Sequence, residues 1–349
     1  MVKTMNYGIP YKGSKNKIAE NIIAQLPSAK HFYDLFGGGG AMTHCALLSG
    51  KYKYVHYNEF NPLVFKAFKM AINGEFEGET RWISREDFEN LKDTDPYVAI
   101  CFSFGNNLKT YAYNKECEKF KKAVHYSIFF NDNSLLKEYI DLSNFNYSSN
   151  NIKERRLELQ RYLTVLFREN KLEVDYSISN SEILQSQKRL ENCKEYFNSV
   201  GNVRNVIQNL ERKVYVNFNS IGTARGVIES LERLERLERF QSLENINNCG
   251  VLLSNLSYEE VSIESDSVIY CDPPYVNTNT YLDEFDHEKF YLWLRSLKQQ
   301  VFISEYQMPS DFYEVFSIKK RVSFSQKQNT QKVEKLFSNI PYVNDPLSW

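Results

Sequence analysis

Apolar runs and helical periodicity alternate over the first hundred residues of the chain. Apolar residues recur at helical spacing over residues 18–26, and β-forming runs occupy residues 31–36 and 54–58. Residues 41–48, between these two runs, have a helical pattern. This order predicts parallel strands with helices packed on them. A further apolar run over residues 98–104 predicts a third core strand.

The same alternation returns in the last hundred residues. Residues 251–254, 268–271 and 301–306 are short apolar runs, and residues 285–297 have helical periodicity. The residues from 313 onward predict a terminal hairpin, formed by residues 313–324 and 335–338. Both ends of the chain are therefore expected to build one Rossmann-like α/β sheet.

The segment between the two ends has a different character. Residues 105–248 are rich in Asn, Tyr, Lys and Glu and include helix-like stretches at 152–167 and 181–197. The pattern predicts a mainly helical domain, residues 105–248, inserted into an α/β domain made of residues 1–104 and 249–349.

Composition narrows the class of protein. A length of 349 residues with 42% hydrophobic content allows two domains or one large one. The six cysteines form no CxxC pair and the five histidines have no metal-ligand spacing, so neither a metal site nor a disulfide framework is expected. We find no signal-peptide layout and no apolar run near the roughly 18 residues of a membrane span. A cytoplasmic protein with no membrane partner is therefore expected.

The net charge of −1 argues at first against a nucleic-acid partner, because duplex binding draws on Lys and Arg. The charged residues, however, are unevenly distributed along the chain. Residues 109–126 contain five lysines against two glutamates. Such a basic run favours DNA binding, although solvated helix faces have the same pattern.

A glycine loop and an acid form the first candidate site. Gly37–Gly40 follows the first predicted strand, and Glu59 ends the second about 20 residues later. Glycines let a ligand approach backbone N–H groups at a helix N-terminus, and an acid at this distance can bind ribose hydroxyls. The loop lacks the full GxGxxG order, which disfavours a dinucleotide and leaves a smaller adenosyl ligand. A glycine run alone is also compatible with a plain turn.

The second candidate site is the tetrapeptide Asp272-Pro273-Pro274-Tyr275. It follows the apolar run 268–271, and its two prolines stop the predicted strand. A carboxylate and an aromatic ring are thus presented at the carboxyl end of a strand, where α/β sheets bind ligands. A surface turn would also explain a bare pair of prolines. The glycine loop and Glu59 favour a site.

Seven short motifs occur in one order along the chain. They are PYKGSK (10–15), DLFGGGG (34–40), Glu59, NLSYEE (255–260), VIYCDPPY (268–275), VFISEY (301–306) and EKLF (334–337). In these motifs, over about residues 7–113 and 251–340, the chain resembles the Dam-type N6-adenine-specific DNA methyltransferases and their phage and restriction-system relatives. The resemblance implies a Rossmann-like S-adenosylmethionine-dependent methyltransferase sheet, with the insertion as target-recognition domain.

The resemblance also implies roles for individual residues. S-adenosylmethionine is the expected cofactor, with S-adenosylhomocysteine as product and no metal. Its binding residues would be Tyr11, Lys15, Asp34, Phe36, Gly37, Gly38, Gly39, Glu59, Ser257, Tyr258 and Asp272. Many family members have aspartate where this chain has Glu59, a longer acid of the same chemistry.

The tetrapeptide suits methyl transfer to an exocyclic amine. The lone pair of such an amine is delocalised into the ring, so the amine is a poor nucleophile. The Asp272 carboxylate and the Pro273 carbonyl can accept its two hydrogens and localise the lone pair. Tyr275 offers a ring on which a base turned out of the duplex can stack. The catalytic candidates are thus the four residues of the tetrapeptide, Asp272, Pro273, Pro274 and Tyr275. Site-specific adenine methylation is therefore the predicted function.

Two alternatives remain open at this stage. The first is the same reaction on the cytosine amine, which commonly uses Ser in place of Asp272. The second is a catalytically idle DNA-binding homologue, which would bind DNA without transferring a methyl group. A glutamine-modifying methyltransferase is disfavoured, because such relatives generally carry Asn at this position.

Double-stranded DNA is the expected partner, and a restriction-system origin would add a cognate endonuclease. The insertion is the expected place of sequence recognition. Candidate base readers are Asn106, Asn107 and Tyr111, and candidate phosphate contacts are Lys109, Lys119, Lys121 and Lys122. The segment after residue 104 departs from the hairpin of relatives that read GATC, so the target sequence is left open.

Overall fold

A computed structural model describes residues 7–168, 250–276, 285–321 and 331–342. The predicted helix at 181–197 and the predicted domain boundary at 248 lie outside these residues. The chain divides into two compact units. The first consists of Met1–Glu79, Arg85–Thr110 and Arg239–Trp349, and the second of Thr80–Ser84 and Tyr111–Glu238.

The first unit is built on a 7-stranded sheet in the order β3-β2-β1-β4-β5-β7-β6. The strands β1 to β5 are parallel to one another, and β7 is antiparallel to both β5 and β6. Their bounds are β1 Ala29–Asp34, β2 Tyr52–Asn58, β3 Val251–Ser254, β4 Ser267–Cys271, β5 Gln300–Glu305, β6 Tyr313–Arg321 and β7 Gln331–Ser338. The strands predicted near these positions, and the pairing of the terminal hairpin, are confirmed.

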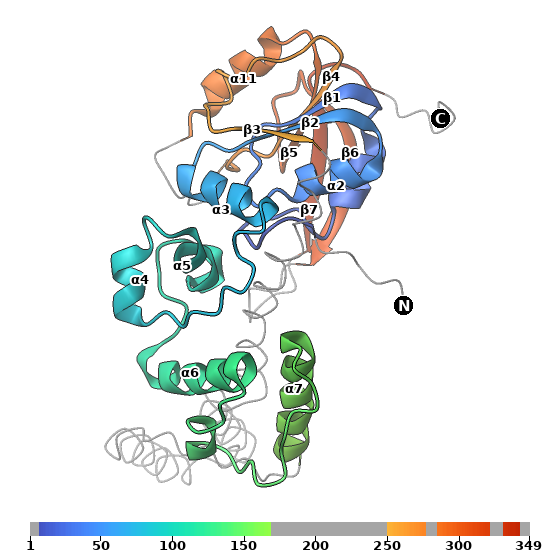
Figure 1. The fold of residues 1–349 in the computed structure, drawn as a ribbon. Helices are drawn as coiled ribbons and strands as arrows, with labels where there is room; N and C mark the ends of the chain where they lie inside the picture. Colours follow the sequence, from blue (N-terminus) through green and yellow to red (C-terminus); the bar gives the residue numbers. More distant parts are fainter. Residues whose placement is uncertain (1–6, 169–249, 277–284, 322–330, 343–349) are drawn as a thin grey trace, which may run out of the picture. The chain divides into compact units, whose positions relative to one another are not determined.

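Helices cover both faces of the sheet. On one face α1 (Ala19–Gln25) and α2 (Ala41–Ser49) bury Ile22 and Met42 against strand residues such as Phe32. On the other face α11 (His287–Ser296) packs Phe290 into a second cluster. Figure 1 shows the strands between α11 and α2. Because both faces are covered, the central strands are apolar on both sides.

Short polar caps fix where the helices begin. Asn61 accepts hydrogen bonds from the backbone of Leu63 and Val64 at the start of α3 (Pro62–Ile72). Asp286 caps α11 in the same way by accepting from the Lys289 N–H. A cap followed by proline is a strong start signal, since proline lacks the N–H that would need a partner there.

The predicted strand at residues 98–104 is wrong. These residues form α5 (Pro96–Cys101) and run into the short 3₁₀ helix η1 (Phe104–Asn106). Asp95 caps α5 by accepting from the N–H groups of Tyr97 and Val98, and α4 (Arg85–Leu91) precedes it. Every residue of α5 is buried, so its sequence has no polar face and is as apolar as a buried strand.

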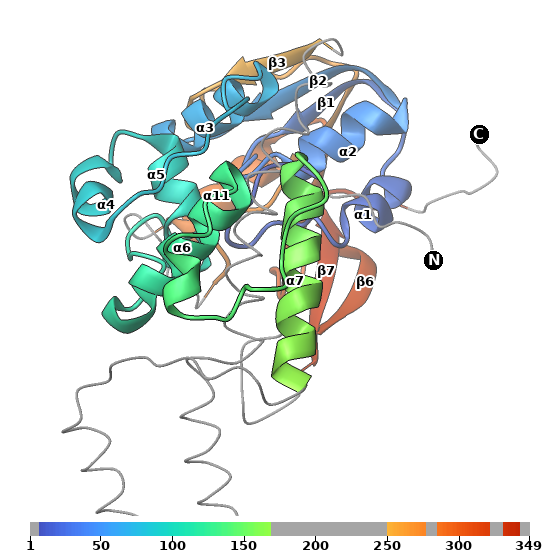
Figure 2. The ribbon, with the colours of Figure 1, turned by 60° about the horizontal axis from the view of Figure 1, so that its bottom comes forward.

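The described part of the second unit contains α6 (Lys115–Phe130), the 3₁₀ helix η2 (Leu136–Glu138) and α7 (Ile152–Arg168). Helices α6 and α7 pack against each other (Figure 2). Arg155 of α7 is buried and donates from Nη1 to the carbonyl oxygen of Ile128 at 3.2 Å, which ties the two helices together.

Candidate active site

The order of the strands reverses between β1 and β4. From β1 the sheet continues to β2 and β3, and from β4 it continues to β5 and β7. Asp34 ends β1 and lies opposite Tyr270, so Asp272 follows β4 at the same edge. A crevice at such a reversal, outside the carboxyl ends of the strands, is the usual ligand site of an open α/β sheet.

The glycine loop joins β1 to α2 in a tightly packed turn. The Gly40 N–H donates to the Gly37 carbonyl at 2.7 Å, and the Ile9 N–H donates to the Gly39 carbonyl at 2.7 Å. A Cβ at Gly39 would lie 2.5 Å from the Ile9 carbonyl oxygen. At Gly38 it would lie 3.0 Å from the Tyr11 ring. The opening motif therefore packs directly on the glycine loop.

Glu59 closes the turn from the side of β2. Its Oε2 accepts from the Gly38 N–H at 2.7 Å and its Oε1 from the Asn61 N–H at 2.8 Å. Burial raises the pKa of Glu59, and the two N–H donors oppose that rise because they favour the carboxylate. Each carboxylate oxygen has a further lone pair that can accept from a ligand hydroxyl.

Asp34 is buried beneath the glycine loop. Its Oδ2 accepts from the Thr43 N–H at 3.1 Å and from the Thr43 hydroxyl at 2.7 Å. Its Oδ1 is buried and has no hydrogen-bond partner among the described residues. Burial raises the pKa of Asp34 to about 7. A buried acceptor without a donor is a place where a ligand or a water is expected.

The NLSYEE motif follows β3 at the same edge. The Asn58 amide donates to the carbonyls of Leu35 and Leu256, both at 3.0 Å, which ties the ends of β1 and β3 together. The backbone N–H of Ser257 donates to Glu260 Oε2 at 2.9 Å. The ring of Phe36 stacks on Tyr258 with centroids 5.4 Å apart. The structure thus brings the two predicted cofactor segments side by side.

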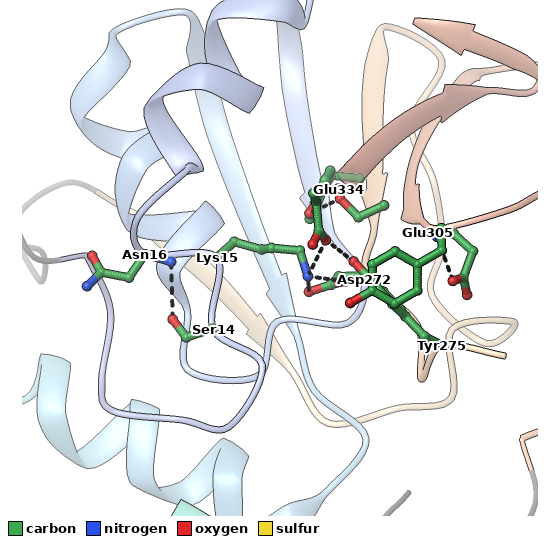
Figure 3. A network of polar contacts seen from close by, with 10 residues as sticks. Ser14, Lys15, Asn16, Asp272, Tyr275, Glu305 and Glu334 are labelled. Carbon is green, nitrogen blue, oxygen red and sulfur yellow. Dashed lines mark hydrogen bonds and ion pairs between the residues drawn. The ribbon is translucent and has the colours of Figure 1, made fainter. Parts of the chain in front are cut away.

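The tetrapeptide lies in a network of buried charges (Figure 3). Lys15 Nζ lies 2.6 Å from both Oδ1 and Oδ2 of Asp272 and 3.2 Å from Oε1 of Glu334. The Tyr275 hydroxyl donates to the same Oε1 of Glu334. Lys15 Nζ also lies 4.9 Å from the centre of the Tyr275 ring. Three segments far apart in the chain thus meet at one lysine.

Burial sets the ionisation of this network. Burial raises the pKa of Asp272, and the ammonium of Lys15 opposes the rise. Burial alone would lower the pKa of Lys15, but Asp272 and Glu334 outweigh it and the pKa is raised. Nearby, Glu305 accepts from the Val276 N–H at 3.2 Å and the Tyr306 N–H at 2.7 Å, and burial raises its pKa to about 7.

The candidate DNA-binding residues differ from one another in exposure and in the contacts that they make. Asn106 and Asn107 stabilise their own loop: Asn106 Nδ2 donates to the Ile100 carbonyl at 2.9 Å, and Asn107 Oδ1 accepts from the N–H groups of Lys109 and Thr110 at 2.9 Å. Lys109 and Lys119 are exposed, while the Lys122 ammonium lies 5.4 Å from the Tyr126 ring centre.

Two of the DNA-binding candidates are buried. Tyr111 is 4% exposed and its hydroxyl donates to the Ile83 carbonyl at 2.8 Å, and Lys121 is 7% exposed. Both side chains belong to the interior of the second unit, so the structure counts against direct contacts of these two residues with DNA. Lys121 lies on the buried face of α6, which the charge pattern of residues 109–126 does not reveal.

The sequence alone predicted no role for Glu334, Glu305 or Thr43. Glu334 lies in the EKLF motif and Glu305 in the VFISEY motif. One signal was available. Glu334 and Leu336 lie two residues apart on β7 and are both buried, so an acid occupies a position of the strand where alternation requires an apolar residue. A buried acid in such a position needs a partner, which here is Lys15.

The seven-stranded sheet, whose strand order reverses between β1 and β4, forms an α/β fold consistent with the S-adenosylmethionine-dependent methyltransferases. Comparison with protein families matches residues 11–344 to the D12 class N6 adenine-specific DNA methyltransferases. The chain belongs to this family and is an enzyme that methylates adenine in DNA. The cytosine alternative is not favoured. Comparison with curated proteins gives no match.

Among the residues that the structure describes, no group of three or more His, Cys, Asp or Glu side chains is arranged to hold a metal ion. None of the helices formed by these residues is long and apolar enough to cross a membrane. Enzymes of this family generally use S-adenosylmethionine as methyl donor.

Proposed function

We propose that the chain transfers a methyl group from S-adenosylmethionine to the exocyclic amine of an adenine turned out of duplex DNA. The observation that carries this proposal is the meeting of Asp272, Tyr275 and Lys15 beside the glycine loop, at the reversal of the strand order. The carboxylate and ring of one tetrapeptide then face the amine and the face of one base.

The residues at the edge fit a cationic adenosyl ligand. Asp34, Glu59 and Asp272 are buried carboxyls whose pKa values are raised by burial, so a cation nearby would relieve the cost of their charge. The unpartnered Oδ1 of Asp34 can accept from an ammonium group. Glu59 would hold the ribose hydroxyls, beside Tyr11 and the N–H groups of the glycine loop. When bound, the cofactor supplies an electrophilic methyl group.

An exposed ring completes this half of the site. Phe60 is 66% exposed and follows Glu59, and Asn255 fixes its backbone by donating to the Phe60 carbonyl at 3.1 Å. An exposed phenyl ring next to a ribose-binding acid can stack on an adenine base. We assign Phe60, together with Ser257 and Tyr258 beyond it, to the adenine end of the cofactor.

The chain's own residues prepare the target amine. Asp272 and the Pro273 carbonyl accept its two hydrogens, which directs the lone pair away from the ring and toward the methyl group. Asp272 is the stronger acceptor when it is ionised, and the ammonium of Lys15 favours that form. Transfer then needs alignment rather than a covalent intermediate on the protein.

Target recognition is proposed for the segment after residue 104. Lys109 and Lys119 are exposed and can contact phosphates, whereas Asn106 and Asn107 act through the shape of their loop. A cognate endonuclease reading the same sequence would be a functional partner. Its substrate would become resistant after methylation by this enzyme.

The test is direct. Purified protein, tritiated S-adenosylmethionine and DNA from a strain without adenine methylation should give labelled N6-methyladenine on nucleoside analysis. Label in N4-methylcytosine, or DNA binding without any label, would overturn the proposal. Sequencing the modified positions identifies the target site in the same experiment.

A further inference from the structure

Glu334 is a buried acid at the edge of the proposed site that the chemistry above does not use. It lies on β7, between β5 and β6, and is 4% exposed. Its Oε1 accepts from the Tyr275 hydroxyl and lies 3.2 Å from Lys15 Nζ. Figure 3 shows its carboxylate reaching the same lysine that pairs with Asp272. Both donors to this carboxylate therefore belong to the site.

The Tyr275 ring is fixed in three ways. Its hydroxyl donates to Glu334, and the Lys15 ammonium lies 4.9 Å from its ring centre. The Tyr306 ring packs against it with ring centroids 4.8 Å apart and an interplanar angle of 88°. A ring held by its hydroxyl, by a cation and by a second aromatic ring offers a pre-oriented surface to an incoming base. Such orientation lowers the entropy that must be lost before reaction.

Glu334 also affects how Lys15 can be shared. In this conformation Lys15 Nζ is 2.6 Å from both oxygens of Asp272. The adenine amine must donate to one of those oxygens. A second carboxylate 3.2 Å from the ammonium lets Lys15 shift part of its hydrogen bonding away from Asp272 while it stays paired.

We propose that Glu334 is a positioning residue for methyl transfer, which orients the Tyr275 ring and shares Lys15 with Asp272. This inference rests on the proposed function of the same site. Glu334 acts through Tyr275 and Lys15 and has no contact with the reacting atoms of its own. Its removal should therefore lower kcat and leave cofactor binding almost unchanged.

The charge of Glu334 gives a second, independent readout. Glu334 raises the pKa of Asp272, so removing its charge should lower that pKa and move the acid limb of the kcat profile to lower pH. The other groups that influence or face Asp272 stay in place in the variant. They are Lys15, Asp34, Tyr11, Tyr270, Cys271, Tyr275, Glu305 and Tyr306.

The experiment compares Glu334→Gln with Glu314→Gln, using unmethylated genomic DNA and tritiated S-adenosylmethionine. Glu314 is an exposed acid that pairs with Lys335 at 2.8 Å on the neighbouring strand, so its variant should behave as wild type. Glu334→Gln should lower kcat on the order of 100-fold, because misplacement of a reacting group by about 1 Å has that effect. Its Kd for S-adenosylmethionine should stay within about twofold of wild type, as expected for an effect confined to alignment.

A Tyr275→Phe background tests the route of the effect. If Glu334 acts through the phenol, Glu334→Gln should lower kcat less in Tyr275→Phe than in wild type. Glu334→Asp keeps the charge but shortens the side chain, so it should lower kcat without moving the acid limb. This variant also serves if Glu334→Gln fails to fold.

The outcomes separate this inference from the proposed function. A wild-type enzyme that gives no N6-methyladenine refutes the function. A wild-type enzyme that methylates adenine, with Glu334→Gln or Glu334→Asp at wild-type kcat, refutes the positioning role alone. An equal loss in both Tyr275 backgrounds refutes the part of the proposal in which Glu334 orients the Tyr275 ring.

Discussion

Buried carboxyl groups gather at the carboxyl edge of the sheet. Asp34, Glu59, Asp272 and Glu305 end or follow β1, β2, β4 and β5, and burial raises the pKa of all four. Acids this close together raise one another's pKa further, as Asp272 and Glu59 do for Asp34. Such a cluster is costly in the free protein and is relieved by a cation, which is a trait of functional sites.

The first prediction concerns Asp272. Asp272→Asn keeps the shape of the side chain but presents an amide, which cannot replace the charged acceptor that Lys15 holds. Methyl transfer should fall on the order of 10²–10³-fold, as when a transition-state hydrogen-bonding group is lost. Tritium incorporation at saturating S-adenosylmethionine measures the rate of transfer, and calorimetry measures the cofactor affinity separately. Asp311→Asn, an exposed acid paired with Arg295, is the control. Near-normal activity of Asp272→Asn would contradict the assigned role.

The second prediction concerns the stability of the free protein against pH. The pKa of Asp34 rises from 3.8 to about 7 on folding, so between these values the folded state holds a proton that the unfolded chain has lost. Stability should therefore fall as pH rises from about 4 to 7, by on the order of 1 kcal/mol per pH unit from this group.

Asp34→Asn should flatten that dependence. The amide oxygen can keep the two hydrogen bonds from Thr43, and the amide nitrogen would take the place of the unpartnered Oδ1. Urea unfolding at several pH values measures the slope. Equal slopes for the variant and the wild type would show that Asp34 does not titrate in this window.

The sequence predicted acidic residues of the candidate site but not the pairs that they form. Asp34, Glu59 and Asp272 each follow a recognisable strand, so local pattern sufficed. The pairing of Lys15 with Asp272 spans 257 residues, and that of Tyr275 with Glu334 spans 59. Such pairs depend on the register of non-neighbouring strands, which no local pattern encodes.

Among the elements, the strands were predictable and α5 was not. The central strands are short, apolar runs ended by glycine, proline or an acid, which few other elements resemble. The α5 segment is equally apolar, but Asp95-Pro96 at its start is a helix signal that the run of residues 98–104 obscured. The cap outweighs β propensity because the neighbouring helices bury α5 on all sides.

The cap of α5 provides the third prediction. Asp95→Ala removes the acceptor for the N–H groups of Tyr97 and Val98, at 2.9 and 3.3 Å. The free energy of unfolding should fall by about 1 kcal/mol, the usual effect of losing a helix cap. Asp93→Ala, two residues earlier and exposed, should leave it unchanged. Indistinguishable urea midpoints for the two variants would argue against the cap.

The glycine loop provides the fourth prediction. A Cβ at Gly39 would lie 2.5 Å from the Ile9 carbonyl oxygen and 2.9 Å from the Tyr11 Cβ, so Gly39→Ala must push the opening motif off the loop. Affinity for S-adenosylmethionine should fall at least about 10-fold, because N–H groups and Tyr11 are displaced together.

Gly50→Ala is the control for this loop. Gly50 has a φ of 68° and no atom within 4 Å of its Cβ position, so alanine there costs about 1 kcal/mol of backbone strain without a clash. Its cofactor affinity, measured by calorimetry, should equal that of wild type. Unchanged affinity in Gly39→Ala would mean that the loop does not hold the cofactor.

At the scale of the whole molecule, the placement of the charged groups matters more than their sum. The chain has a net charge of −1, and its first unit concentrates buried carboxyls at the carboxyl edge of the sheet. DNA is an anion and must therefore be attracted by local basic surface elsewhere. Lys109 belongs to the first unit and Lys119 to the second, so both units are expected to contribute.

The salt dependence of DNA affinity tests whether both lysines contact phosphates. Each phosphate contact adds about 0.9 to the slope of log Kd against log salt concentration, so Lys109→Ala and Lys119→Ala should each lower the slope by about that amount. Lys30 is exposed near the amino end of β1, the edge of the sheet opposite the site, and Lys30→Ala should leave the slope unchanged. Fluorescence anisotropy with a labelled duplex between 50 and 200 mM salt, roughly the range in which such contacts dominate, gives the slopes. If the Lys119 variant keeps the wild-type slope while Lys109→Ala lowers it, Lys119 makes no phosphate contact and the expectation for this residue is wrong.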